Sequence, residues 1–217
     1  MTLRIGVLIS GRGTNLQALI DACAEPTYPA EIAMVISNEP DAKGLERAQD
    51  ARIPTKIIEH RAFMDRSAFE AALTSSLQRA GVELVCNAGF MRILTGTFVD
   101  TWHNRAINIH PSLLPAFTGL KTHERAIRSG VRFSGCTVHF IRAALDAGPI
   151  IIQSVVPVLP TDTPEDLAAR VLESEHKCLP QAVRWIAEGR VRVVDEIVQI
   201  EEADGTTDVL TNPSIAS

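Results

Sequence analysis

The most constraining feature of the sequence is the regular alternation of short apolar runs with amphipathic segments in its first 86 residues. Continuous apolar strands that alternate with amphipathic helices are typical of a parallel sheet covered on both faces. In such sheets ligands bind at the carboxyl ends of the strands. The predicted strands are 3–10, 32–37, 55–58 and 82–86, and the predicted helices begin at Asn15, Ala42 and Asp65.

The second half of the chain has a different pattern. Proline and glycine interrupt it often, and its predicted strands are joined by turns. Thr163-Pro164-Glu165-Asp166 opens a long predicted helix, 163–188, with a strong N-terminal signature. No linker-like segment separates the halves, so one domain spanning 1–217 is expected, with a mobile tail at 204–217. The other predicted elements are strands at 106–109, 136–141 and 150–159, a helix at 123–129 and a strand pair within 191–199.

Composition excludes several classes of protein. A net charge of −5 without a Lys/Arg stripe argues against a nucleic-acid-binding protein. No apolar run is long enough to span a bilayer, and the first strand leaves no room for a signal peptide. The four cysteines and six histidines lack disulfide or metal-ligand spacing. A cytoplasmic protein without a metal is predicted.

Two glycines, Gly11 and Gly13, lie between the first strand and the first helix. Glycines there let the backbone approach an anion at the helix N-terminus, although a plain tight turn needs them equally. Leu16 occupies the position where a dinucleotide-binding loop has its third glycine, and the P-loop lysine is absent. One phosphate, held by backbone amides with Thr14 and Asn15, fits this loop better. Asn15 is also expected to cap the helix.

Four stretches of the sequence form a set of motifs. They are Ser10–Asn15 (SGRGTN), Gly89–Leu94 (GFMRIL), Asn108–Pro115 (NIHPSLLP) and Leu145–Ile150 (LDAGPI). In this order they resemble the phosphoribosylglycinamide formyltransferases of purine synthesis, from about residue 3 to about residue 190. The last two motifs are shared with other folate-dependent formyl enzymes, including formyltetrahydrofolate deformylase, and the glycine loop favours the ribonucleotide enzyme.

The resemblance implies a fold and a reaction. The fold is α/β and Rossmann-like, with a largely parallel twisted sheet, helices on both faces and an antiparallel C-terminal portion. The reaction moves the formyl group of the co-substrate 10-formyltetrahydrofolate to the amine of glycinamide ribonucleotide, without a metal. Residues 1–85 are then expected to bind the ribonucleotide phosphate, and 86–200 to bind folate and carry the catalytic groups.

The candidate catalytic residues are Asn108, His110 and Asp146. Asn108 and His110 are two apart on a strand end, so their side chains lie on one side and can donate to a developing oxyanion. The resemblance implies that Asp146 positions His110 and a water for proton transfer. The structural alternatives are a turn-capping Asn108, a buried structural His110 and an Asx-turn Asp146.

Family similarity also implies the folate-binding residues. An apolar segment can enclose a pterin ring while its backbone groups bind the ring edge. Arg66 is expected near the acidic tail of the folate, where a guanidinium suits a carboxylate. Core packing of Ile93 and Leu94, and a solvated helix face for Arg66, are the alternatives. The remaining folate candidates are Met91, Arg92, Ile93, Leu94, Asn108 and Ile141.

For the ribonucleotide, the candidates are Gly13, Thr14, Asn15 and Glu175. Glu175 matches a carboxylate that contacts the ribose or amine in this family, although alone it would be a helix-surface glutamate. Leu172 departs from the family, whose members commonly have a polar side chain there, near the phosphate. Either Arg12 or another group compensates, or phosphate binding depends more on the glycine loop.

Two other functions remain open. The same folate site would serve a formyltetrahydrofolate hydrolase, but water as the acceptor needs no phosphate-binding loop. A non-catalytic nucleotide-binding module would not need Asn108, His110 and Asp146 together. The expected partners are the two small-molecule substrates, with no nucleic acid and no membrane, and the expected state is a monomer or homodimer.

Overall fold

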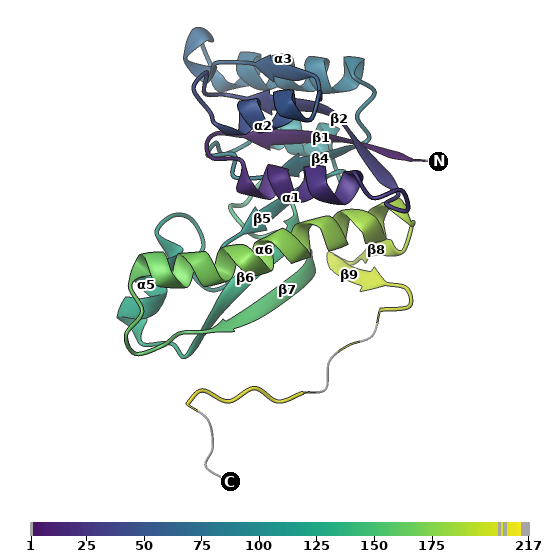
Figure 1. Cartoon of the computed structure of the whole chain (residues 1–217). Helices are drawn as coiled ribbons and strands as arrows, with labels where there is room; N and C mark the ends of the chain where they lie inside the picture. Colours follow the sequence, from purple (N-terminus) through teal and green to yellow (C-terminus); the bar gives the residue numbers. More distant parts are fainter. Residues whose placement is uncertain (1, 204, 206–207, 214–217) are drawn as a thin grey trace.

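The computed structural model describes residues 2–203, 205 and 208–213; the rest of the expected tail lies outside the described residues. They form a seven-stranded sheet with helices on both faces, and a two-stranded hairpin (Figure 1). The strands are β1 (Leu3–Ile9), β2 (Ala30–Ser37), β3 (Thr55–Ile57), β4 (Leu84–Asn87), β5 (Ala106–His110), β6 (Phe133–Phe140), β7 (Ile150–Pro157), β8 (Val191–Val194) and β9 (Ile197–Ile200). The helices are α1 (Thr14–Cys23), α2 (Gly44–Asp50), the 3₁₀ turn η1 (His60–Ala62), α3 (Arg66–Arg79), α4 (Gly96–Thr101), α5 (Thr122–Ser129) and α6 (Pro164–Ala187).

The order of the strands in the sheet is β3-β2-β1-β4-β5-β6-β7. The pairs from β3 to β5 are parallel, and β6 and β7 are antiparallel to their neighbours. The expected α/β fold, with its antiparallel C-terminal portion, is confirmed. Because β1 and β4 lie side by side, the glycine loop after β1 and the loop after β4 leave the same edge of the sheet.

Alternation along the strands gives the sheet a core on each face. The α6-side core contains Ile5, Val7 and Ile9 of β1, packed with α1, α2, α5 and α6. The α3-side core contains Leu8 of β1, packed with α3 and α4. Both faces are therefore covered, as the continuous apolar strands predict.

Helix α6 starts as its sequence signature predicts. The Thr163 hydroxyl accepts from the backbone N–H of Asp166, and the Asp166 carboxylate accepts from the Thr163 N–H, which is a capping box. The helix then crosses the sheet beside α1 (Figure 1). Its buried face is apolar except for Glu175, which is only 7% exposed.

β6 and α4 are two of the elements that differ from expectation. β6 begins at Phe133, not at 136, although Ser134 and Gly135 interrupt the apolar run. A Cβ on Gly135 would lie 1.8 Å from the Ser154 carbonyl oxygen of β7, so only glycine allows this strand approach. α4, which is six residues long, is too short to show a helical period.

No helix in the described part of the chain is long and apolar enough to cross a membrane.

Candidate active site

A cavity of about 620 Å³ opens at the carboxyl ends of β4 and β5. Its walls are the loop after β4, the residues around His110, the segment 119–123, and the loop 141–146 after β6. Eight residues predicted from the sequence line it: Met91, Arg92, Ile93, Leu94, Asn108, His110, Ile141 and Asp146.

His110 and Asp146 face each other in this cavity. The His110 Nδ1 lies 3.5 Å from the Asp146 Oδ2, and both side chains are largely buried. His110 Nε2 is 3.1 Å from the Phe117 carbonyl oxygen. A carbonyl only accepts, so Nε2 donates this bond. Asp146 Oδ2 accepts from the Gly119 N–H at 2.8 Å. The loop that contains Phe117 and Gly119 thus contacts both members of the pair.

Asn108 is oriented by His139, a residue that the sequence analysis did not select. Burial, the largest cause, lowers the pKa of His139, so its ring is neutral at neutral pH. Its Nδ1 lies 2.9 Å from the Phe140 carbonyl and donates to it, so Nε2 accepts from the Asn108 Nδ2 at 3.2 Å. One proton of the Asn108 amide is used in this way, and the other, which has no partner among the described residues, can bind a ligand.

The apolar wall of the cavity has two kinds of residue. Met91 and Ile93 are 67% and 56% exposed, whereas Leu94 is 7% exposed and belongs to the α3-side core. Core packing therefore accounts for Leu94 but not for Ile93. Arg66 is exposed on the first turn of α3 and is not among the residues that line the cavity. Its contact with a folate tail stays a prediction.

The expected cap of α1 by Asn15 is wrong. The helix starts at Thr14 from Gly13, whose left-handed backbone (φ 69°) forms the N-cap without a side-chain hydrogen bond. Asn15 lies inside the first turn, and its Nδ2 donates to Glu175 Oε2 at 2.7 Å. Glycine allows this left-handed conformation, so the helix begins at Thr14, one residue before the predicted start at Asn15.

Asn15 and Glu175 form a buried polar pair between α1 and α6. Burial raises the pKa of Glu175, and the hydrogen bond from Asn15 acts in the opposite direction. The Asn15 Oδ1 is buried and has no hydrogen-bond partner among the described residues. Glu175 is therefore not the helix-surface glutamate of the alternative interpretation.

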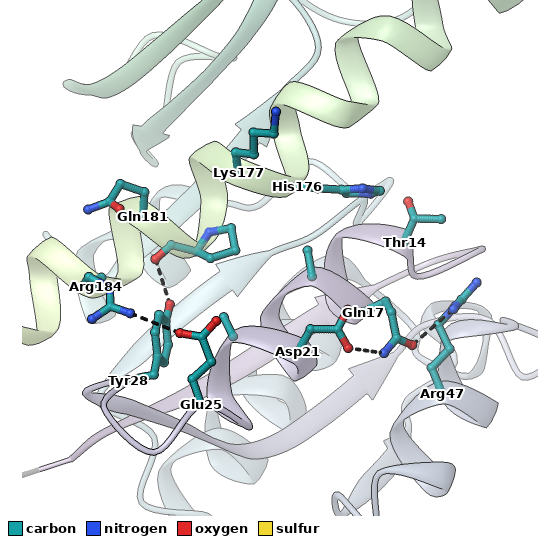
Figure 2. A pocket seen from close by; sticks show the side chains of 13 residues that line it. Thr14, Gln17, Asp21, Glu25, Tyr28, Arg47, His176, Lys177, Gln181 and Arg184 are labelled. Atoms are coloured by element: carbon teal, nitrogen blue, oxygen red, sulfur yellow. Dashed lines mark hydrogen bonds and ion pairs between the residues drawn. The ribbon is translucent and has the colours of Figure 1, made fainter.

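A second hollow, of about 610 Å³, lies between α1 and α6 (Figure 2). Thr14, Arg47 and His176 lie at one end of it, next to the glycine loop (Figure 2). Arg47 donates from Nε to the Arg12 carbonyl at 3.0 Å and from Nη1 to Gln17 at 3.1 Å. Arg47 of α2 thereby connects the glycine loop to the first turns of α1.

His176 lies one helical turn beyond the half-buried Leu172. Its Nε2 is buried without a hydrogen-bond partner in the described part of the chain. Burial, and then the charge of Arg47, lower its pKa, while Asp21 and Glu173 act against this. The i, i+4 spacing from Leu172 is the sequence signal that could have selected His176.

The comparisons with known proteins show the family of the chain. A model of the formyl transferase family matches residues 3–183. The chain belongs to the formyl transferase family. Within it, phosphoribosylglycinamide formyltransferases of Haemophilus influenzae and Escherichia coli are 43% and 44% identical, over 91% and 88% of this chain and 93% and 90% of theirs. The resemblance read from the sequence is confirmed.

Larger relatives and solved structures extend the comparison. The trifunctional purine biosynthetic protein adenosine-3 of Gallus gallus is 48% identical over 88% of this chain, which spans only 19% of that protein. A crystal structure of glycinamide ribonucleotide transformylase 1 from Symbiobacterium toebii has a TM-score of 0.90 and 51% identity, covering 92% and 94% of the two chains. A formyltetrahydrofolate deformylase from Pseudomonas syringae is more distant, with a TM-score of 0.86 and 28% identity over 92% of this chain and 66% of its own.

Among the described residues, no group of three or more His, Cys, Asp or Glu side chains is arranged to hold a metal ion.

Proposed function

We propose that this formyl transferase moves the formyl group of 10-formyltetrahydrofolate to the amine of glycinamide ribonucleotide. One observation carries the proposal. Ser10, at the start of the glycine loop, donates its N–H to the Gly89 carbonyl at 3.2 Å, and its Oγ accepts from the Met91 N–H at 2.8 Å. The loop suited to a phosphate is therefore bonded to the apolar wall suited to a pterin.

On the donor side, the exposed Met91 and Ile93 offer an apolar face to a flat heteroaromatic ring. The backbone of the same segment supplies donors and acceptors to the ring edge. Arg92 and Ile141 complete the wall, and Arg66 is proposed for the carboxylates of the folate tail.

On the acceptor side, the amides of the first α1 turn and Thr14 are proposed to bind the phosphate. Asn15, which the sequence analysis assigned to the phosphate, donates to Glu175, so both side chains are proposed to contact the ribose or the amine. Arg47 and His176 would face the phosphate from the hollow in Figure 2, where Leu172 has no polar group to offer.

The chemical step follows from the groups at the base of the cavity. The amine attacks the formyl carbon, and the carbonyl oxygen becomes an oxyanion that Asn108 and His110 stabilise. His110 would exchange its bond to the Phe117 carbonyl for this oxygen. Asp146 holds His110 and a water that carries the proton from the attacking amine to the leaving folate nitrogen.

Incubation of the protein with 10-formyltetrahydrofolate, followed by folate absorbance, tests the proposal. We expect turnover with glycinamide ribonucleotide and none with water alone. The matched control is the same acceptor without its phosphate, which we expect to react at a much lower kcat/KM. Turnover without any acceptor would make the protein a hydrolase, and no turnover at all would leave a binding module. The expected cytoplasmic location and the monomer or homodimer state stay predictions.

A further inference from the structure

Arg142 ties the start of the cavity loop 141–146 to a distant part of the chain. Its guanidinium donates to both carboxylate oxygens of Glu196, from Nε at 2.7 Å and from Nη2 at 3.1 Å. The same group donates to Asn104 Oδ1 at 2.8 Å and to the Ile141 carbonyl at 3.0 Å. The Arg142 side chain is only 14% exposed. A planar guanidinium with this many fixed partners holds its own backbone in place.

Glu196 belongs to the tight turn of the β8–β9 hairpin, which follows the last residue matched by the family model, 183. The two central turn residues, Asp195 and Glu196, have φ angles of 50° and 60°. Such turns usually contain Asn or Gly, because other residues are strained there. The hairpin accepts this strain at the residue whose carboxylate binds Arg142. The underside of the hairpin packs on the α6-side core through Val191, Val193, Val198 and Ile200.

The far end of the same loop is held by separate contacts. Asp146 is fixed by Gly119 and faces His110. The residues on either side of the loop are joined by a hydrogen bond from the Phe140 N–H to the Pro149 carbonyl at 2.9 Å. The Arg142–Glu196 ion pair therefore acts on the first residues of the loop and not on the proposed route of the proton.

We infer that Glu196 is a positioning residue for the formyl donor: through Arg142 it fixes the cavity wall formed by the start of the 141–146 loop. This inference rests on the proposed function for the identity of the ligand. The Glu196 side chain is 61% exposed, so the ion pair adds little to the stability of the whole fold. The ion pair orders the loop before the formyl donor binds. Donor binding then does not lose the conformational entropy that ordering the loop would otherwise require.

The variant that tests the inference is Glu196→Gln, which keeps a hydrogen-bond acceptor and removes the charge. We expect the amides of residues 143–145 to exchange with deuterium faster, by about threefold to tenfold, because the loop opens more often. We expect the KM for 10-formyltetrahydrofolate to rise by a similar factor of about three to ten, with kcat within about twofold.

The matched control is Glu201→Gln, at the open end of the same hairpin. Glu201 pairs with Arg192 of β8 at 3.0 Å, so its ion pair lies at the opposite end of the hairpin from the turn. We expect neither loop exchange nor KM to change in this variant. In an Arg142→Ala background, Glu196→Gln should have no further effect, because the partner through which it acts is gone.

Unchanged exchange at 143–145 in folded Glu196→Gln would overturn the inference, whatever the substrate is. Faster exchange with an unchanged donor KM would overturn the part that concerns the donor. Equal effects of the two hairpin variants would show a general loss of structure instead. If the parent protein transfers no formyl group, the proposed function fails, and the exchange comparison still decides whether Glu196 orders the loop.

Discussion

His110 is engaged at both ring nitrogens, and the two partners differ in chemistry. Nε2 donates to the Phe117 carbonyl, and Nδ1 faces the Asp146 carboxylate. A carboxylate at that position can take part in proton transfer, and a carboxamide cannot. We therefore expect Asp146→Asn to lower kcat by roughly 10²–10⁴, the usual range for a proton-transfer group.

Asparagine retains an oxygen that can accept from the Gly119 N–H, so the loop contact survives in this variant. Binding of both substrates, measured by calorimetry, should stay close to that of the parent. Near-normal turnover in Asp146→Asn would remove this residue from the mechanism.

Glu175 makes the stability of the protein depend on pH. Burial raises its pKa above the ordinary value of 4.5, so the native state binds this proton more tightly than the unfolded chain does. The free energy of unfolding then falls as pH rises from 4.5 through the raised native pKa. Glu175→Gln lacks this loss, so we expect it to gain stability relative to the parent across that window.

Urea unfolding of both proteins at several pH values between about 4 and 8 checks the Glu175 prediction. Parallel curves of unfolding free energy against pH would contradict it. The same variant should bind glycinamide ribonucleotide more weakly if Glu175 contacts that ligand.

The glycine loop shows at the level of an element how two similar residues have different roles. A Cβ on Gly13 would lie 2.5 Å from the Gly44 Cα, and its φ angle is left-handed. We expect Gly13→Ala to lower the free energy of unfolding by at least about 1–2 kcal/mol. A Cβ on Gly11 would have no atom of the described residues within 4 Å, so Gly11→Ala should be nearly neutral for stability.

Gly11→Ala is therefore the cleaner test of phosphate binding by this loop. We expect about tenfold weaker binding of glycinamide ribonucleotide in the folded variant, because the methyl group obstructs the approach to the backbone. Calorimetric titration measures it, with folate binding as the control. Parent-like affinity would show that the loop is only a turn.

Most elements were predictable because their periods are long enough to recognise. The strands of the parallel half and the capping-box start of α6 follow the sequence closely. The start of α1 at Thr14 was not predicted, because its N-cap is a left-handed Gly13 and not a residue with a capping side chain. α4 could not be predicted, since one and a half turns carry no clear period.

The site was predictable only in part. Asn108 and His110 were predictable as neighbours because they are two residues apart at the end of β5. Asp146 comes from the loop after β6, which is antiparallel to β5, so its approach to His110 depends on the path of that loop and not on the order of the strands. The contacts of Phe117 and Gly119 with this group depend on the path of an irregular loop, which residue spacing does not encode.

At the scale of the whole molecule, one sheet is shared by two cores. Trp102, 2% exposed, belongs to the α3-side core, and Trp185 packs against the α6-side core. We expect both to report one cooperative transition, because the central strands contribute side chains to both faces. Urea unfolding of Trp102→Phe and Trp185→Phe, followed by fluorescence, should give the midpoint seen by circular dichroism in each variant. Different midpoints from the two probes within one background would indicate separate folding units.

The order of strands also matters while the chain is being synthesised. In the seven-stranded sheet, each strand after β1 pairs with a strand that precedes it in the sequence, since β2 and β4 flank β1 and the others add outward. The sheet can therefore grow as the polypeptide leaves the ribosome, without any of these strands waiting for a later partner. The packing of α6 is different. This helix covers α1, β6 and β7, and all three must wait for it because it is synthesised after them. Until residue 187 has emerged, that apolar surface is open to chaperones and to other nascent chains.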